Sequence, residues 1–203
     1  MRPLTMAALL VAAAAYAQDK PADKAKFAGP TESGFLLPNG WHLTPVGQHV
    51  VTTDLPLNIL PLKDGRHALV ATSGFNRHDL MVIGISGSEP KVVTTDSVRQ
   101  SWYGLAMDKA ESKVWWSGGG FGRLHTFDLA GVKLVRTSKP EPEPKKDAPR
   151  PKEKEDPTPP RPFNSGLCLD EERGVLYSLL INSGELAAIS LKDGAVQTAK
   201  IGG

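Results

Sequence analysis

A segment of one pattern occurs three times in this chain, at residues 55–87, 101–131 and 162–194. Each copy contains a short apolar strand, a charged turn, a second apolar strand, a Gly/Asn/Ser-rich turn and a third strand that ends near a glycine. A further short stretch follows each copy, and we expect it to form a fourth strand. These stretches are residues 91–95, 132–137 and 195–201. Four short strands that recur about every 40 residues are typical of the blades of a β-propeller.

The repeat predicts an all-β fold, namely an incomplete β-propeller with about three four-stranded blades. A propeller closes its ring with about four to eight blades, whereas the third repeat runs almost to the last of the 203 residues. An open stack leaves two sheet faces that a closed ring would bury. We therefore expect self-association through these exposed blade faces.

The first 17 residues have the pattern of an export signal. Arg2 supplies a positive charge, residues 6–15 form an Ala-rich apolar run, and Ala15-Tyr16-Ala17 fits the small-residue rule for cleavage. The apolar run is shorter than the roughly 20 residues of a membrane span. We expect a signal helix at 1–17 and a periplasmic or secreted protein with no membrane span after cleavage.

Composition divides the remaining chain into a lead-in, a propeller and an insertion. Residues 18–33 are polar and predict a flexible lead-in, and residues 34–203 predict the partial propeller, which opens with strands at 41–44 and 49–53. Residues 138–162 contain more than half of the 17 prolines, with Glu and Lys between them. Because the blade pattern resumes directly afterwards, we interpret this segment as a disordered insertion within the propeller. A linker between two domains is the alternative.

Charge and cysteine content constrain the partners. The formal net charge is only +2, so we expect no nucleic-acid partner and instead an unidentified protein or small-molecule ligand. Cys168 is the single cysteine, which excludes an intramolecular disulfide. Because it lies in an apolar strand, we expect a buried and inert thiol.

No residue pattern predicts catalysis, a cofactor or a metal. The run GGGFGR at 118–123 lacks the spacing of a phosphate-binding loop and lies between two strands, which favours a hairpin turn. The five histidines lack ligand spacing, and His78 alone lies in a polar turn that could face a funnel. No nucleophile motif of the Gly-x-Ser-x-Gly type is present. We expect no enzymatic activity from this chain by itself.

Four residues are candidates for lining the axial channel of the propeller. Trp102 and Tyr103 open the first strand of the second repeat, and Asn58 and Asn164 occupy comparable points of the other two. Aromatic residues in blade strands usually fill the core. Two interpretations therefore stay open for this aromatic pair, a place in the core or a place on the wall of the channel.

Four runs carry a family resemblance. They are LLPNGWHLTPVG (36–47), DLPLNI (54–59), KDGRHALVATSGFN (63–76) and KVWWSGGGFGRLHTFDL (113–129). The chain resembles secreted bacterial YncE-like, YVTN-type β-propeller proteins, and it is similar to the N-terminal propeller of those members that continue into a phosphoesterase domain of the alkaline phosphatase superfamily. The resemblance covers residues 34–203 apart from the insertion, and this sequence contains no phosphoesterase domain.

Three functions follow as hypotheses. The first is a non-catalytic exported propeller segment that serves as a binding or scaffold module. The second is an accessory N-terminal domain of a secreted phosphoesterase. The third is a fragment of a lactonase-type propeller enzyme, whose site would need ligands from more blades than three repeats supply.

Overall fold

The computed structural model describes residues 27–44, 46–75, 77–139 and 162–201, and every regular element in these ranges is a β-strand. The chain divides into two compact units, Met1–Gly47 and Gln48–Gly203. The predicted signal at 1–17 and most of the predicted insertion at 138–162 lie outside the described residues. In the part of the chain that is described, no helix is long and apolar enough to cross a membrane.

The first unit contains a small antiparallel sheet of three strands. Its strands are β1 (Gly29–Thr31), β2 (Gly34–Leu36) and β3 (His42–Leu43), in the order β1-β2-β3. The strand β1 lies inside the segment 18–33, where we expected only a lead-in. It forms because a tight turn returns the chain at once, so that Thr31 pairs with Gly34 and Gly29 with Leu36. The strand expected at 41–44 is confirmed at its centre.

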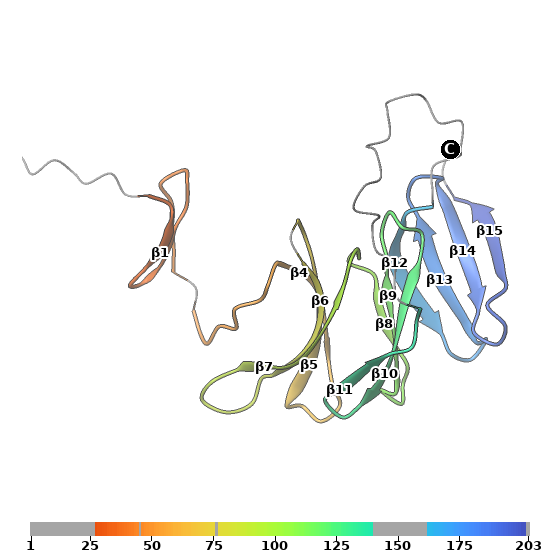
Figure 1. Ribbon diagram of the computed structural model, residues 1–203, viewed down its shortest axis with the longest axis horizontal. Helices are drawn as coiled ribbons and strands as arrows, with labels where there is room; N and C mark the ends of the chain where they lie inside the picture. The colour runs from red at the N-terminus through yellow and green to blue at the C-terminus, as the bar shows by residue number, and fades with distance from the viewer. Residues whose placement is uncertain (1–26, 45, 76, 140–161, 202–203) are drawn as a thin grey trace, which may run out of the picture. The chain divides into compact units, whose positions relative to one another are not determined.

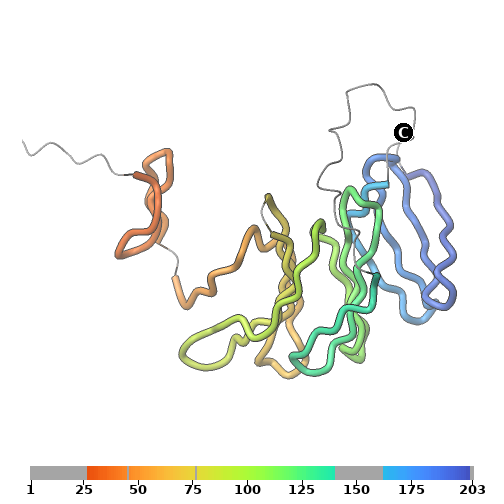
Figure 2. Tube along the Cα trace, viewed as in Figure 1, coloured from red at the N-terminus to blue at the C-terminus, as the bar shows by residue number. Residues whose placement is uncertain are grey.

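The second unit contains three four-stranded antiparallel sheets, which stand in chain order (Figures 1 and 2). Blade 1 is β4 (Leu55–Pro61), β5 (His67–Ser73), β6 (His78–Gly84) and β7 (Lys91–Val98). Blade 2 is β8 (Leu105–Met107), β9 (Lys113–Ser117), β10 (Leu124–Ala130) and β11 (Lys133–Arg136). Blade 3 is β12 (Asn164–Asp170), β13 (Val175–Leu180), β14 (Glu185–Ser190) and β15 (Val196–Lys200). Each strand pairs with the next, so the first and fourth strands form the edges of each sheet.

The predicted all-β, incomplete propeller is confirmed by these sheets. The turn from β4 to β5 shows why the pattern could be read from sequence. Gly65 has a φ of +65°, which favours glycine, and Asp64 Oδ1 accepts the backbone N–H groups of Arg66 and His67 at 2.8 and 3.0 Å. Carboxylate caps of this kind make the Asp-Gly turn a strong local signal.

The main core lies between blades 1 and 2. Its buried members from blade 1 include Leu69, Leu80 and Val82, and blade 2 supplies Trp116 and Phe127. Trp116 has no exposed surface, and its Nε1 donates a 2.7 Å hydrogen bond to the carbonyl oxygen of Trp102. Burying a side chain of this size stabilises the fold by about 4 kcal/mol or more.

Residues 48–54 form no strand, so the strand predicted at 49–53 is wrong. This segment crosses the face of blade 1 that points away from blade 2. Val50 packs against Val70, Met81 and Ile83 there, and the hydroxyl of Thr53 donates a 2.5 Å hydrogen bond to Oδ2 of Asp79. The segment is fixed by side chains, because its apolar and hydroxyl groups find partners on the sheet without a backbone ladder.

Candidate functional site

The first strands of the three blades bring a group of aromatic and amide side chains together. The structure supports a candidate site made of Asn58, Trp102, Tyr103, Phe163 and Asn164, which we call the inner ledge. Asn58, Trp102 and Asn164 precede the turn aspartate of their blade by the same separation in sequence, and these aspartates are Asp64, Asp108 and Asp170. Blade symmetry therefore explains why these positions meet.

The backbone of blade 2 fixes the two exposed aromatic residues of the inner ledge. Trp102 N donates to Ser117 O, and Ser117 N donates to Gly104 O, each at 2.8 Å, so that residues 102–104 extend the pairing of β8 with β9. The side chains remain accessible, with 36% of Trp102 and 40% of Tyr103 exposed. A fixed backbone with accessible rings suits ligand contact, because little backbone freedom remains to be lost on binding.

Asn58 joins blade 1 to this aromatic pair. It follows a β-bulge between Pro56 and Asn58, where the proline cannot donate to the ladder. Its Nδ2 donates a 2.8 Å hydrogen bond to the carbonyl oxygen of Tyr103. Two of the four predicted channel residues are thus in direct contact through a side chain and a backbone carbonyl.

Phe163 completes the aromatic surface, although it was not among the residues predicted from the sequence to line the channel. Its ring meets that of Trp102 edge to face, with centroids 5.6 Å apart and an interplanar angle of 89°, a favoured geometry for aromatic pairs. The ring centroids of Trp102 and Tyr103 are 6.3 Å apart. A signal was available, because Phe163 directly precedes Asn164 and the blade equivalence already pointed to that position.

Asn164 lies deeper than the other predicted channel residues, with only 5% of its surface exposed. Its backbone N–H donates to Gly119 O at 3.1 Å, which ties blade 3 to blade 2. Its Nδ2 donates to Ser178 Oγ at 3.2 Å. Its Oδ1 is buried and has no hydrogen-bond partner among the described residues. Asn164 therefore supports the inner ledge from beneath, and a channel around all four residues stays a prediction.

The polar groups around His78 link blade 1 to the chain that enters blade 2. Nδ1 of His78 accepts the backbone N–H of Ser101 at 3.0 Å and lies 3.1 Å from Ser73 Oγ. The Ser73 hydroxyl donates in turn to Ser101 O at 3.0 Å. An acceptor at Nδ1 places the proton of the neutral ring on Nε2. These contacts give His78 a structural role in holding the entry to blade 2.

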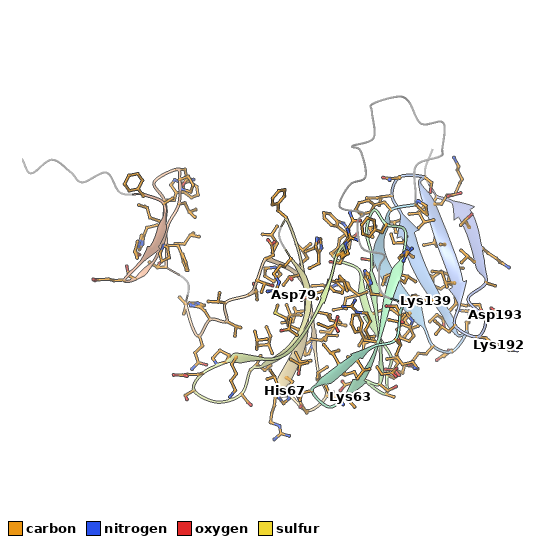
Figure 3. The ribbon with its side chains drawn as sticks, viewed as in Figure 1. Lys63, His67, Asp79, Lys139, Lys192 and Asp193 are labelled. Carbon is orange, nitrogen blue, oxygen red and sulfur yellow. The ribbon has the colours of Figure 1, made fainter. Side chains whose placement is uncertain are left out.

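The carboxylate of Asp79 is fully buried and bound on both oxygens. Its Oδ1 accepts from Ser97 Oγ and its Oδ2 from Thr53 Oγ1, each at 2.5 Å, while Arg77 Nε lies 3.6 Å away. Figure 3 shows Asp79 toward the end of the blade opposite Lys63 and His67. Hydroxyl donors and a cation are the partners that a buried carboxylate needs, so Asp79 secures residues 48–54 to blade 1.

The charged turns at the other end of the blades contact one another. The backbone N–H of Lys63 donates to Glu111 Oε1 of blade 2, and that of Lys109 donates to Glu171 Oε1 of blade 3, each at 2.7 Å. Within the first turn, the hydrogen bond from the His67 side chain lowers the pKa of Asp64 to about 2, with help from the backbone N–H of Arg66. Glu111 and Glu171 thus hold neighbouring blades together, and Asp64 holds its own turn.

The run 118–123 and the single cysteine differ in how well their environment was predicted. The run 118–123 is a hairpin turn, as predicted, with Gly118 N donating to Arg123 O at 2.8 Å. Cys168 is exposed, so the expectation of a buried thiol is wrong. The reason is that Cys168 points to the face of blade 3 that no described sheet covers. Within the described ranges, no three His, Cys, Asp or Glu side chains are grouped as metal ligands would be.

Comparison with known proteins supports the fold. No protein-family model and no curated protein matches the sequence. The Cps50 (Swd1) β-propeller domain of Myceliophteria thermophila is similar with a TM-score of 0.52 and 11% identity, covering 73% of this chain and 44% of that one. A functionally unknown protein from Desulfotomaculum acetoxidans has a TM-score of 0.51 and 13% identity, and the match covers 83% of this chain and 53% of that one. The periplasmic gluconolactonase PpgL of Pseudomonas aeruginosa has a TM-score of 0.49 and 11% identity, and the match covers 73% of this chain and 41% of that one.

The class of the molecule follows from these observations together. Three meander sheets in chain order and the likeness to a solved propeller domain identify an incomplete β-propeller. The chain spans about half the length, or less, of the solved structures named above.

Proposed function

We propose that this chain is a non-catalytic, exported β-propeller segment that serves as a binding or scaffold module. The observation that carries the proposal is the inner ledge, where three successive blades contribute to one aromatic and amide surface. The accessible rings of Trp102 and Tyr103 stand on a backbone fixed by Ser117 and Asn58. Exposed aromatic residues on a rigid support are typical of binding surfaces.

The polar groups next to the inner ledge favour binding over catalysis. His78 accepts a backbone N–H at Nδ1, and both oxygens of Asp79 accept hydroxyl groups. A general base must be within reach of a substrate proton. His78 instead holds the chain that enters blade 2, and Asp79 secures residues 48–54 to blade 1, so both groups have structural tasks.

Binding can be tested with labelled chain on arrays of glycans and short peptides. We expect specific binding to one class of probe, and we expect the Trp102→Leu/Tyr103→Ser double variant to lose it. Trp41→Leu is a matched control, because it removes a 70% exposed tryptophan from the first unit. Binding that survives in the double variant would place the ligand elsewhere, and binding to neither array would count against a glycan or peptide ligand.

Catalysis is tested separately with D-glucono-1,5-lactone and p-nitrophenyl phosphate. We expect no turnover above the spontaneous rate with the purified full chain. Turnover that disappears in the Trp102→Leu/Tyr103→Ser variant would overturn the non-catalytic assignment. It would favour the lactonase or the phosphoesterase alternative, according to the substrate consumed.

Export and family membership complete the proposal. The apolar run at 6–15 and the Ala15-Tyr16-Ala17 site support delivery to a periplasm or to the outside. The PNGW run at 38–41 and the LPLNI run at 55–59 support a YncE-like, YVTN-type propeller, including the alternative of an accessory domain for a phosphoesterase. Expression in a bacterial host should yield a mature chain that begins at Gln18, and an unprocessed chain in the cytoplasm would contradict export.

A further inference from the structure

The outer face of blade 3 is an apolar sheet surface, and we propose that it pairs with the same face of a second copy of this chain. The surface, which we call the blade 3 face, consists of Cys168, Tyr177, Leu179, Leu186 and Ala188. Tyr177 pairs with Cys168 on one side and with Ala188 on the other, and Leu179 pairs with Leu186. Paired residues of an antiparallel sheet lie on one face, so these five side chains form one surface.

The packing of blades 1 and 2 shows what such a face does elsewhere in the molecule. The second strands of the three blades can be aligned by their turn pairs, which are Leu62 with His67, Asp108 with Lys113, and Asp170 with Val175. Tyr177 and Leu179 then correspond to Leu69 and Ala71 of blade 1. Leu69 and Ala71 are 0% and 1% exposed, because they pack against blade 2.

The residues of the blade 3 face occupy positions that are buried in blade 1, but no described part of the chain covers them in blade 3. The opposite face of the same sheet is closed, with Leu176 and Ser178 at 0% exposed against blade 2. Cys168 is exposed and Tyr177 is partly exposed. A sheet face of this kind is stabilised when a second sheet packs on it about 10 Å away.

The other end of the stack does not offer an equivalent surface for head-to-tail packing. Residues 48–54 cross the free face of blade 1, where Val50 packs on Val70, Met81 and Ile83. A groove of about 310 Å³ remains beside Val50, lined in part by Ile59. A sheet could reach this face only by displacing the segment that Asp79 secures. Among the two end faces of the stack, only the blade 3 face is open. In a dimer with a twofold axis, the blade 3 face of one copy would pack against the blade 3 face of the other.

Charge supports pairing of like with like. The five residues of the blade 3 face carry no carboxylate, amine or guanidinium group; their polar groups are the thiol of Cys168 and the phenol of Tyr177, and the face continues on β15 as Gln197 and Ala199. Asp170, two residues beyond Cys168 on β12, lies at the rim of the same face. Two copies in twofold contact would thus bring no like charges together at the centre. Burying apolar surface favours such an association and opposes the cost of the translational and rotational freedom that is lost.

The experiment uses sedimentation velocity and thiol labelling of the full chain over about two decades of concentration. We expect a reversible monomer–dimer equilibrium and labelling of Cys168 that slows several-fold as the dimer forms. Leu186→Glu should abolish the dimer and make labelling independent of concentration. Val196→Glu is the matched control, because Val196 is 58% exposed, pairs with Ile189 and lies on the opposite face of the same sheet.

Several results would overturn the proposal. A monomer at all concentrations would do so, as would a dimer in which Cys168 stays fully reactive or which Leu186→Glu leaves intact. Circular dichroism checks that Leu186→Glu is folded. If it is not, labelling of the unaltered chain decides alone, because only pairing through the blade 3 face makes the thiol rate fall with concentration. The ligand proposed for the inner ledge plays no part in this outcome.

Discussion

The backbone N–H of Lys63 in blade 1 donates a 2.7 Å hydrogen bond to Oε1 of Glu111 in blade 2. The arrangement recurs one blade later, where Lys109 N donates to Glu171 Oε1 at the same distance. The side chain of Lys63 also donates from Nζ to Lys109 O. The charged turns of blades 1 and 2 are therefore each held by a carboxylate from the blade that follows.

Replacing Glu111 should loosen the contact between blades 1 and 2. Glu111→Leu removes a charged acceptor from the Lys63 N–H, and we expect the free energy of unfolding to fall by about 1 kcal/mol. Urea denaturation followed by circular dichroism measures this. Glu89→Leu serves as a control, because Glu89 lies in the exposed loop between β6 and β7. Equal effects of the two substitutions would show that the contact contributes nothing specific.

Acid should weaken the first turn of blade 1. The pKa of Asp64 is lowered from 3.8 to about 2, chiefly by the hydrogen bond from the His67 side chain. Because the folded pKa is the lower one, ionised Asp64 stabilises the fold above about pH 4, and this contribution is lost as the pH falls through 2. An NMR titration should place the Asp64 pKa near 2 and should show it rising in His67→Ala. An unchanged pKa in that variant would contradict the assigned cause.

Two glycines near the inner ledge should respond very differently to alanine. A Cβ at Gly104 would lie 1.8 Å from the carbonyl oxygen of Ser165, whereas a Cβ at Gly166 would first meet Tyr103 Oη at 3.4 Å. Gly104→Ala should therefore push blades 2 and 3 apart and lower the free energy of unfolding by about 3 kcal/mol. Gly166→Ala should change it by less than about 1 kcal/mol. Thermal unfolding of both variants tests the tightness of this contact.

Removing the buried carboxylate of Asp79 should release residues 48–54. Asp79→Ala leaves the hydroxyls of Thr53 and Ser97 without their acceptor, and we expect a loss of about 3 kcal/mol in stability. Ser97→Ala removes one donor only and should cost about half as much. Limited proteolysis with a protease of broad specificity should cleave residues 48–54 faster in Asp79→Ala than in the unaltered chain. An unchanged rate of cleavage would mean that Asp79 does not secure the segment.

Local patterns predicted the blades well. The run at 67–73, which is apolar from Ala68 to Ala71, became β5 with the same bounds, because a strand covered on both faces favours consecutive apolar residues. The turns followed from Asp-Gly and related pairs. Positions whose environment depends on another blade were harder. The run around Cys168 has the composition of a covered strand, but its exposure is decided by what packs on blade 3.

The inner ledge could be predicted in part. Blade equivalence brought Asn58, Trp102 and Asn164 together, because the repeat sets their position relative to the turn aspartates. The depth of Asn164 and the contact of Phe163 with Trp102 depend on how closely blade 3 approaches blade 2. That distance is fixed by Gly104 and Ser165, which lie far apart in sequence.

The contact between blades 1 and 2 extends farther from the inner strands than the contact between blades 2 and 3. Blades 1 and 2 are joined along their fourth strands as well, where Arg136 binds Asp96 and Thr94 Oγ1 donates to Val132 O at 2.7 Å. Blade 3 meets blade 2 through β12, against β8 and β9. A groove of about 470 Å³ separates them farther out, between Trp115 and Leu191.

Blades 1 and 2 are therefore braced at their outer strands as well as in their shared core. Blade 3 contacts blade 2 through β12, the buried side of β13 and the hydrogen bond from Lys109 N to Glu171 Oε1, and it has no counterpart of the Arg136 brace among the described residues. The pairing of Gly119 with Asn164 lies beside the ring of Phe163, so any change in the spacing of blades 2 and 3 would directly alter the aromatic surface of the inner ledge.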